Sequence, residues 1–296
     1  MLNNFRKTFV LVAVVATLST GCKYSKQYQK ISDAGDQYTT AIDKLLDKAN
    51  ELQIDSSSEK LLQNDRISNV EPNIYQNYKN NDKEILELIS GIREHNNLLR
   101  EYFSKLRQLA SSKAPDLVEN EITGIATNLQ TIGDRLQTNS SLPRPIVIGK
   151  VGKLMVNSKI EGALKKELDR RGDTILEQLE IQGEMLNVLG EIMKTRVQSL
   201  KDARELRLVI RPLAETEPMT DNSTSEWMQL RKEILLMDKQ LKEIEEASSA
   251  LGDFQDIYKA SVEGKINSQF INQNLEDIDR FLALLQNNND SNQQEN

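Results

Sequence analysis

The sequence predicts an all-α fold, an elongated antiparallel bundle in which helices pair as coiled-coil hairpins. Hydrophobic residues make up 38% of the 296 residues, aromatic residues 5% and charged residues 28%. This composition suits long helices with narrow apolar stripes better than a thick globular core. Apolar residues recur at heptad spacing along several segments, whereas no segment alternates with period two for long enough to predict a strand. Because each helix has one apolar stripe to bury, we expect the helices to pack side by side.

The first element is a leader over residues 1–21, which has the three parts of a secretory signal peptide. Arg6 and Lys7 make the start basic, residues 8–18 are mostly apolar, and small residues precede position 22. The apolar run is about eleven residues long, whereas a helix that crosses ~30 Å of hydrocarbon needs roughly twenty. A permanent transmembrane anchor is therefore the less favoured interpretation of this segment.

The only cysteine of the chain, Cys22, stands directly after the run Leu18-Ser19-Thr20-Gly21. In this segment the sequence resembles the bacterial lipoprotein class. The resemblance implies a diacylglyceryl group, palmitate among its acyl chains, on the Cys22 thiol and cleavage between Gly21 and Cys22. It covers only the leader, and Ser19 stands where leucine or another apolar residue is usual. The alternative is that Cys22 is an incidental or buried thiol, because free cysteines often behave as small hydrophobes.

The same resemblance predicts the location and the partners of the chain. Two or three acyl chains make release from a membrane negligible, so we expect a lipid-anchored protein that faces outside the cytoplasm. Lys23, rather than aspartate, follows the cysteine, which favours the periplasmic face of the outer membrane where the envelope has two membranes. The expected partners are that membrane, through the lipid on Cys22, and an envelope protein or a second copy of the chain.

Charge and rare residues argue against several other functions. The formal net charge is −7, and removal of Arg6 and Lys7 with the leader makes it about −9, which disfavours a nucleic-acid binder. With one cysteine and one histidine, the chain lacks the residues for an internal disulfide, a zinc cluster or a paired-histidine metal site. Its many carboxylates suit the solvated outer faces of coiled coils. We therefore predict no enzyme, no cofactor, no metal site and no small-molecule substrate.

The coiled-coil pattern is most regular between residues 85 and 109. Two interleaved series there lie seven residues apart: Ile85, Ile92, Leu99 and Leu106, and Leu88, His95, Tyr102 and Leu109. Weaker seams run through 168–200, 230–258 and 271–285. We expect helices near 25–53, 57–69, 72–111, 115–138, 146–211, 224–264 and 268–286.

Residue types at the expected boundaries support this division. Ser56 with Glu59, and Ser223 with Glu226, have the spacing of capping boxes at helix starts. Pro72 and Pro115 suit first-turn positions. Several glycines between 149 and 183 predict a break or kink within the long helix expected over 146–211.

Two further features are candidates for function. The stretch 143–156 is the most apolar part of the chain after the leader, so its residues are candidates for contact with a partner or a membrane: Ile146, Val147, Ile148, Val151, Leu154 and Met155. The alternative is a turn followed by a helix that faces the core. His95 lies at an interior seam position, where a histidine acts as a pH switch or is hydrogen-bonded as a structural residue.

The sequence thus predicts three regions: a signal peptide over 1–21, a helical bundle over 22–285 that can divide near 140–145, and a disordered polar tail over 286–296. We expect a membrane-anchored helical lipoprotein with a structural or protein-interaction role in the cell envelope. The alternative is a membrane-active, pore-forming-like helical protein that uses the apolar 143–156 segment.

Overall fold

The structure is a computed structural model and describes residues 3–63, 72–111, 115–139, 142–144, 146, 148, 153–158, 160–215, 218–252, 254–265 and 276. Within these residues, the side chains of 3–31, 110, 111, 238–250 and 252 lie outside the description. All regular elements in the described part are helical, as predicted: α1 (Asn3–Gln63), α2 (Pro72–Ser111), α3 (Pro115–Gln137), α4 (Gly162–Arg204), the π-helix η1 (Glu205–Ile210), α5 (Arg211–Leu213), α6 (Asp221–Gly252) and α7 (Phe254–Val262).

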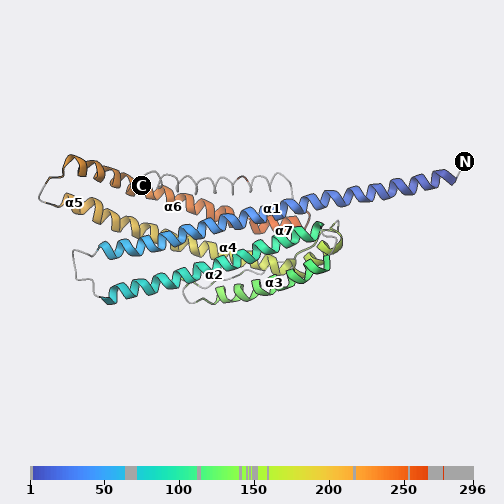
Figure 1. Cartoon of the computed structure of the whole chain (residues 1–296), viewed down its shortest axis with the longest axis horizontal. Helices are drawn as coiled ribbons and strands as arrows, with labels where there is room; N and C mark the ends of the chain where they lie inside the picture. Colours follow the sequence, from blue (N-terminus) through green and yellow to red (C-terminus); the bar gives the residue numbers. More distant parts are fainter. Residues whose placement is uncertain are drawn as a thin grey trace.

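The helices form an elongated antiparallel bundle (Figure 1). Helix α1 packs on α2 and α4, α3 packs on α2 and α4, and α6 and α7 pack on α4. Ion pairs show that α1 and α2 run antiparallel, because Arg93, Arg100 and Arg107 of α2 meet residues of falling number on α1: Asp47, Asp43 and Asp33. The N-terminal part of α1 projects beyond the bundle at one end (Figure 1). We call this end proximal, and the opposite end, where α1 and α5 finish, distal.

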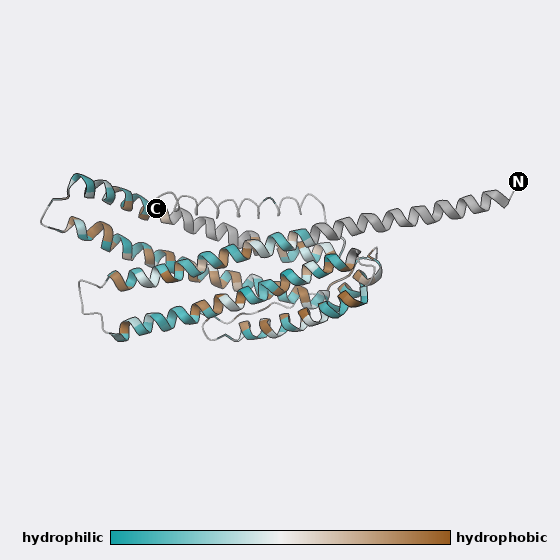
Figure 2. Ribbon diagram, viewed as in Figure 1, coloured by the Kyte–Doolittle hydropathy of each residue, from teal (hydrophilic) through white to brown (hydrophobic). Residues whose placement is uncertain are grey.

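The elements with the most regular patterns match their predictions. Helix α2 has the predicted bounds and α3 ends one residue early, and Pro72 and Pro115 occupy the first helical positions. All eight residues of the two predicted heptad series of α2 are buried, with exposed fractions between 0% and 7%. Hydrophobic and hydrophilic residues also alternate along the other helices of the bundle (Figure 2). A helix buried along one stripe accounts for this pattern.

The predicted break near Ser56 is wrong, because α1 is one helix from Asn3 to Gln63. Ser56 and Glu59 do not cap a helix start; both are buried in the helix interior, with exposed fractions of 2% and 6%. The Glu59 carboxylate instead forms ion pairs with Arg204, at 3.6 Å, and with Arg207. The Ser56–Glu59 spacing therefore marks residues buried inside the bundle rather than a helix start.

The predicted helix over 146–211 is wrong in its first part, because α4 begins at Gly162. The described residues before it have no regular secondary structure, and we call residues 142–161 the strap. Its Leu154 packs on α4 at Gly172, where a Cβ atom would lie 2.6 Å from Leu154 Cδ2. Glycine at 172 therefore makes room for the strap. Gly162 has φ +69°, a left-handed value at the start of α4 that glycine adopts without strain.

The C-terminal third also differs in detail from the prediction. The predicted capping box at Ser223 is wrong: α6 begins at Asp221, and the Thr220 hydroxyl accepts a hydrogen bond from the Ser223 amide at 3.3 Å. The helix predicted over 224–264 is divided into α6 and α7. The helix predicted over 268–286 and the tail predicted over 286–296 lie outside the described residues, apart from Glu276.

The core is richest in aromatic side chains at the proximal end. Tyr38 of α1 stacks on Phe254 of α7 with ring centroids 4.3 Å apart. Phe103 of α2 meets Phe254 and Tyr258 edge to face, at 5.6 and 6.0 Å. All four rings are no more than 1% exposed. This cluster joins three helices at the level where α1 leaves the bundle.

Candidate functional site

Cys22, the predicted lipidation site, and Gly21, at the predicted cleavage site, both lie on α1. Their side chains are outside the description. The described part of α1 runs from there into the aromatic cluster without a break. No helix among the described residues is long and apolar enough to cross a membrane.

The strap does not offer its apolar residues as a continuous surface. Ile146 and Leu154 are buried in the core, with exposed fractions of 8% and 7%, and Ile148 packs against the same core. The Leu154 amide donates to Asp173 Oδ1 of α4 at 2.6 Å. Met155 alone of the described candidates is exposed, at 76%. Val147 and Val151 lie outside the described residues.

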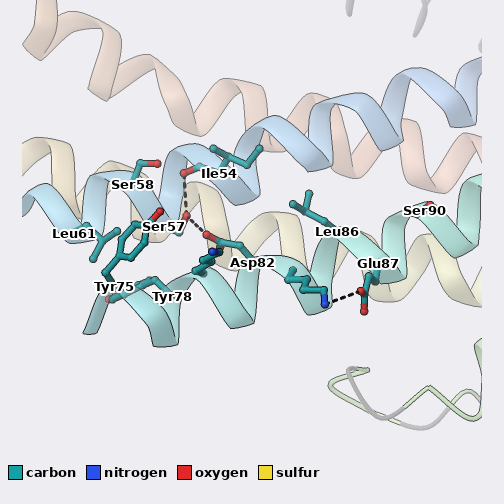
Figure 3. A pocket seen from close by; sticks show the side chains of 12 residues that line it. Ile54, Ser57, Ser58, Leu61, Tyr75, Tyr78, Asp82, Leu86, Glu87 and Ser90 are labelled. Atoms are coloured by element: carbon teal, nitrogen blue, oxygen red, sulfur yellow. Dashed lines mark hydrogen bonds and ion pairs between the residues drawn. The ribbon is translucent and has the colours of Figure 1, made fainter. Parts of the chain in front are cut away.

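A groove lies between α1 and α2 near the distal end (Figure 3). Its volume of about 580 Å³ lies within the range of small ligand sites, roughly 300–1,000 Å³. Apolar and aromatic side chains share the lining with hydroxyl and charged groups: Ile54, Ser57, Ser58, Leu61, Tyr75, Tyr78, Lys79, Asp82, Lys83, Leu86, Glu87 and Ser90. A groove that combines apolar and polar side chains is suited to binding an amphipathic partner.

The polar groups in the groove are held by bonds within the bundle. Gln53 Nε2 donates to Asp82 Oδ1 at 2.7 Å, and Ser57 Oγ donates to Asp82 Oδ2 at 2.9 Å. Gln53 Oε1 in turn accepts from Arg196 Nε of α4 at 2.7 Å. Both oxygens of the Asp82 carboxylate are therefore engaged, and the chain of bonds fixes the position of α2 relative to α1 and α4. Asp82 on α2 is thereby joined to Gln53 and Ser57 on α1.

Sequence reasoning did not find this groove. Its members on α1, Ile54 and Leu61, lie seven residues apart, so their spacing is the signal of a second apolar stripe. Ile54 is 48% exposed and Tyr75 on α2 is 57% exposed. Because Ile54 falls in the connection expected between the helices over 25–53 and 57–69, the stripe is not visible in the predicted elements.

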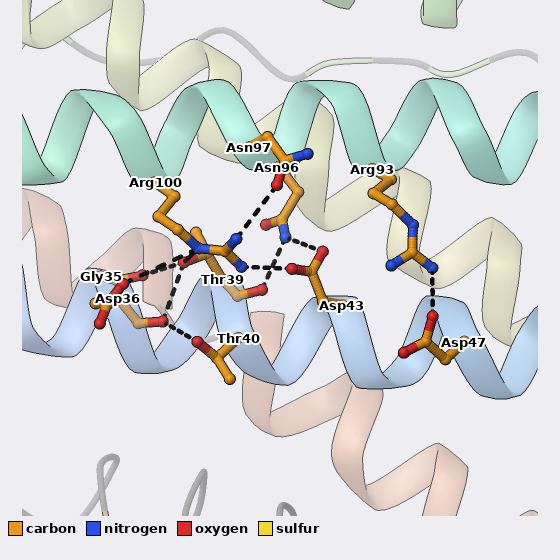
Figure 4. A network of polar contacts seen from close by, with 10 residues as sticks. All are labelled: Gly35, Asp36, Thr39, Thr40, Asp43, Asp47, Arg93, Asn96, Asn97 and Arg100. Carbon is orange, nitrogen blue, oxygen red and sulfur yellow. Dashed lines mark hydrogen bonds and ion pairs between the residues drawn. The ribbon is translucent and has the colours of Figure 1, made fainter.

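A second polar cluster joins α1 and α2 nearer the middle of the rod (Figure 4). Arg100 donates to the Asp43 carboxylate and, at 3.2 Å, to Thr39 Oγ1. The buried Asn96 amide donates to the Thr39 carbonyl at 2.8 Å and to Asp43 Oδ1 at 2.9 Å. Arg93 pairs with Asp47 at 2.7 Å. These contacts fix the register of the two helices, and their acidic groups are neutralised by arginine.

His95 is fully buried at the predicted seam position, between two glutamines of α4. Its Nδ1 lies 2.6 Å from Gln182 Oε1 and its Nε2 lies 3.0 Å from Gln178 Oε1. Burial lowers the pKa of His95, although the two glutamine contacts act in the opposite direction. A neutral imidazole has a single N–H, so the ring donates to one glutamine and accepts from the other once that amide is turned. The structure thus confirms a hydrogen-bonded seam histidine.

A buried ion pair on α4 faces α3. Arg171 bonds the Glu167 carboxylate and the Thr123 hydroxyl, and Glu167 is 2% exposed. Burial raises the pKa of Glu167, against the lowering effect of the Arg171 charge. Burial also raises the pKa of the nearby Tyr102 hydroxyl. The ion pair itself lies within α4, and the bond from Arg171 to Thr123 joins α4 to α3.

Within the part of the chain that the structure describes, no group of three or more histidine, cysteine or acidic side chains is arranged to hold a metal ion. The chain matches no known family model, no curated protein and no solved structure. The candidate sites therefore stand on their own geometry: a cysteine on the projecting helix, and an open groove at the other end of the same helix.

Proposed function

We propose that this chain is a bacterial lipoprotein in which lipid on Cys22 tethers a helical rod to a membrane and the rod binds another protein of the cell envelope. One observation carries the proposal. The only cysteine of the chain stands directly after small residues that end a basic and apolar leader. Acyl chains at that thiol hold a protein at a bilayer because each buried methylene contributes about 0.8 kcal/mol.

The arrangement of α1 supports this role. The helix that carries Cys22 also forms one wall of the distal groove, and 41 helical steps separate Cys22 from Gln63, a distance of about 60 Å at ~1.5 Å per residue. An anchor at one end of a stiff helix leaves the other end free to meet a partner. In this proposal the partner contributes an amphipathic helix, whose apolar side chains enter between Ile54 and Tyr75.

Lipidation is tested by labelling bacterial cells that produce the full chain with an alkyne analogue of palmitate. We expect the label on the protein, the protein in the membrane fraction, and an intact mass that starts at residue 22 with added acyl chains. The substitution Cys22→Ser should abolish the label and prevent cleavage before residue 22.

The matched control is Ser19→Ala, which keeps a small residue in the run before the cysteine and should retain the label. An unmodified residue 22 in native cells, with the leader attached or removed elsewhere, would falsify the proposed tether. Loss of label in the Ser19→Ala variant would show that the leader is read differently from the lipoprotein class.

A further inference from the structure

Helix α6 carries apolar side chains on two opposite faces. Its inner face is buried against α4, with Ile234 3% and Met237 7% exposed. Met228, Leu235 and Leu236 are 55%, 50% and 51% exposed on the outer side. An ordinary surface helix has a polar outer face. We call Met228, Lys232, Leu235 and Leu236 the α6 outer stripe, because residues at spacings of four and seven lie on one side of a helix.

The outer stripe is part of a braced hairpin. Trp227 Nε1 donates to the Val209 carbonyl of η1 at 3.1 Å, which ties the start of α6 to the helix beside it. The Thr220 hydroxyl caps the first turn of α6. The stripe is therefore present in the folded state and needs no opening of the bundle. Helices α2 and α6 do not contact each other in the described part and lie on opposite long edges of the bundle (Figure 1).

The charge of the stripe identifies the class of surface that it fits. Arg231 and Lys232 are exposed between Met228 and Leu235, although the whole chain has a net charge of −7. Glu233, the nearest acid, bonds Gln229 at 2.7 Å. In a second copy packed on this face, Lys232 would meet another cation, which is destabilising. A convex helix face with leucine, methionine and long basic side chains has the chemistry of helices that lie in the interface of an anionic bilayer.

We propose that the α6 outer stripe rests on the anionic surface of the membrane that holds Cys22, so that the rod lies along this membrane. This inference rests on the proposed function for the presence of the anchor. The Tyr38–Phe254 stack places α1 and α7 at one level, with Cys22 16 residues to one side and Leu235 19 residues to the other. The two contacts are thus about 50 Å apart along the rod.

Two contacts at this separation orient the rod where a single anchor leaves it free to pivot. Because the lipid keeps the stripe close to the bilayer, a weak second contact is sufficient. With α6 against the membrane, α2 lies on the far edge of the bundle. The groove between α1 and α2 then remains open to a partner while the rod is held down.

Trp227, the only tryptophan of the chain, directly precedes Met228 and is half-buried against η1, so its fluorescence reports how near the bilayer comes to this turn of α6. The lipidated protein is reconstituted into vesicles that contain brominated acyl chains and either phosphatidylglycerol or only phosphatidylcholine. We expect bromine to quench Trp227 fluorescence in phosphatidylglycerol vesicles. We expect less quenching in phosphatidylcholine, and less again in high salt, because two cations near an anionic surface favour binding about tenfold or more.

The variant Leu235→Glu should lose the quenching, because it places a negative charge on the face that meets the anionic surface. The Leu235 side chain is half exposed, so the change leaves the core intact. Leu117→Glu is the matched control: Leu117 is 69% exposed on α3, and the same substitution there should keep the quenching. Equal quenching of the parent and Leu235→Glu, equal quenching in both lipids, or no quenching at all would overturn the proposal. A dimer of the parent protein in which a second copy covers the α6 outer stripe, and which Leu235→Glu dissociates, would also overturn the proposal.

A chain that starts at residue 22 and carries Cys22→Ser, and so has neither the leader nor the lipid, separates this inference from the proposed function. When it is added to phosphatidylglycerol vesicles, we expect it to bind, but at least about tenfold more weakly than the lipidated protein. If residue 22 is unmodified in cells and this variant still binds through Leu235, the tether fails and the stripe stands. If the lipid is present and Trp227 is not quenched, the tether stands and the stripe fails.

Discussion

The two ends of the rod are built from the same helices but are held together by different forces. At the proximal end, α1 contacts its neighbours through aromatic rings, and Gly35 is close enough that a Cβ atom would lie 2.6 Å from Phe103. At the distal end, α1 contacts α4 and η1 through Glu59, which meets two arginines. The comparison indicates that, along one long helix interface, aromatic packing at the proximal end provides most of the stability, whereas polar pairs at the distal end fix the orientation of the helices.

The distal pairing has a regular geometry. Arg204, Arg207 and Arg211 follow one another at spacings of three and four residues, and all face α1. Arg211 bonds the Gln63 carbonyl, so the series reaches the last residue of α1. The π-helix η1 lies within this series, and such segments change the angle at which side chains leave a helix. With polar groups inside, the distal half has several large apolar side chains outside, among them Ile54 and Leu235.

Removal of a proximal ring should have the largest effect on stability. Phe254→Ala removes a fully buried ring that touches two others, and such changes cost about 3–5 kcal/mol. Urea unfolding measures this loss. The distal counterpart is Leu213→Ala, whose side chain is 62% exposed, and it should change the free energy of unfolding by less than about 0.5 kcal/mol. Equal losses in the two variants would contradict the assignment of stability to the proximal half.

Loss of the distal carboxylate should have a smaller and more local effect. Glu59→Ala removes the carboxylate that pairs with Arg204 and Arg207. Because these arginines are 37% and 29% exposed, we expect a cost of about 1–2 kcal/mol rather than that of a fully buried pair. Hydrogen exchange should become faster near residues 52–63 and 200–213 and stay unchanged near 34–46. Asp55→Ala is the control, since Asp55 is 53% exposed and forms a long, weak ion pair with Arg204 at 3.9 Å. Uniformly faster exchange would show that the two halves open together.

The contrast between the two halves also explains which features the sequence revealed. The heptads of α2 bury apolar residues along their own helix axis, so local spacing predicts them. Glu59 was read as a capping residue because its arginine partners come from more than 140 positions later in the chain. The strap was read as part of a helix because the glycine that receives Leu154 belongs to α4. Residue spacing along the chain reveals the apolar period of a helix, but it does not reveal which distant element packs against that helix.

His95 lies between the two halves and gives the smallest of the expected effects. Burial lowers its pKa in the folded state, so the unfolded chain binds the proton more readily. The histidine therefore contributes stability that is complete above its ordinary pKa of about 6.5 and is lost as the pH falls towards its folded pKa. In this window the slope is at most about 1.4 kcal/mol per pH unit. Glu167 acts in the opposite sense, because a raised pKa adds stability as the pH falls.

The substitution His95→Gln isolates the histidine contribution, since the chain has no other histidine. Urea midpoints between pH about 7 and about 5 should fall for the parent protein and stay level, or rise slightly through Glu167, for the variant. Glu167→Gln is the matched control and should steepen the fall instead. If the urea midpoints of the parent and of His95→Gln change equally with pH, the proton is taken up by another group. Protonation of His95 then does not account for the pH dependence of stability.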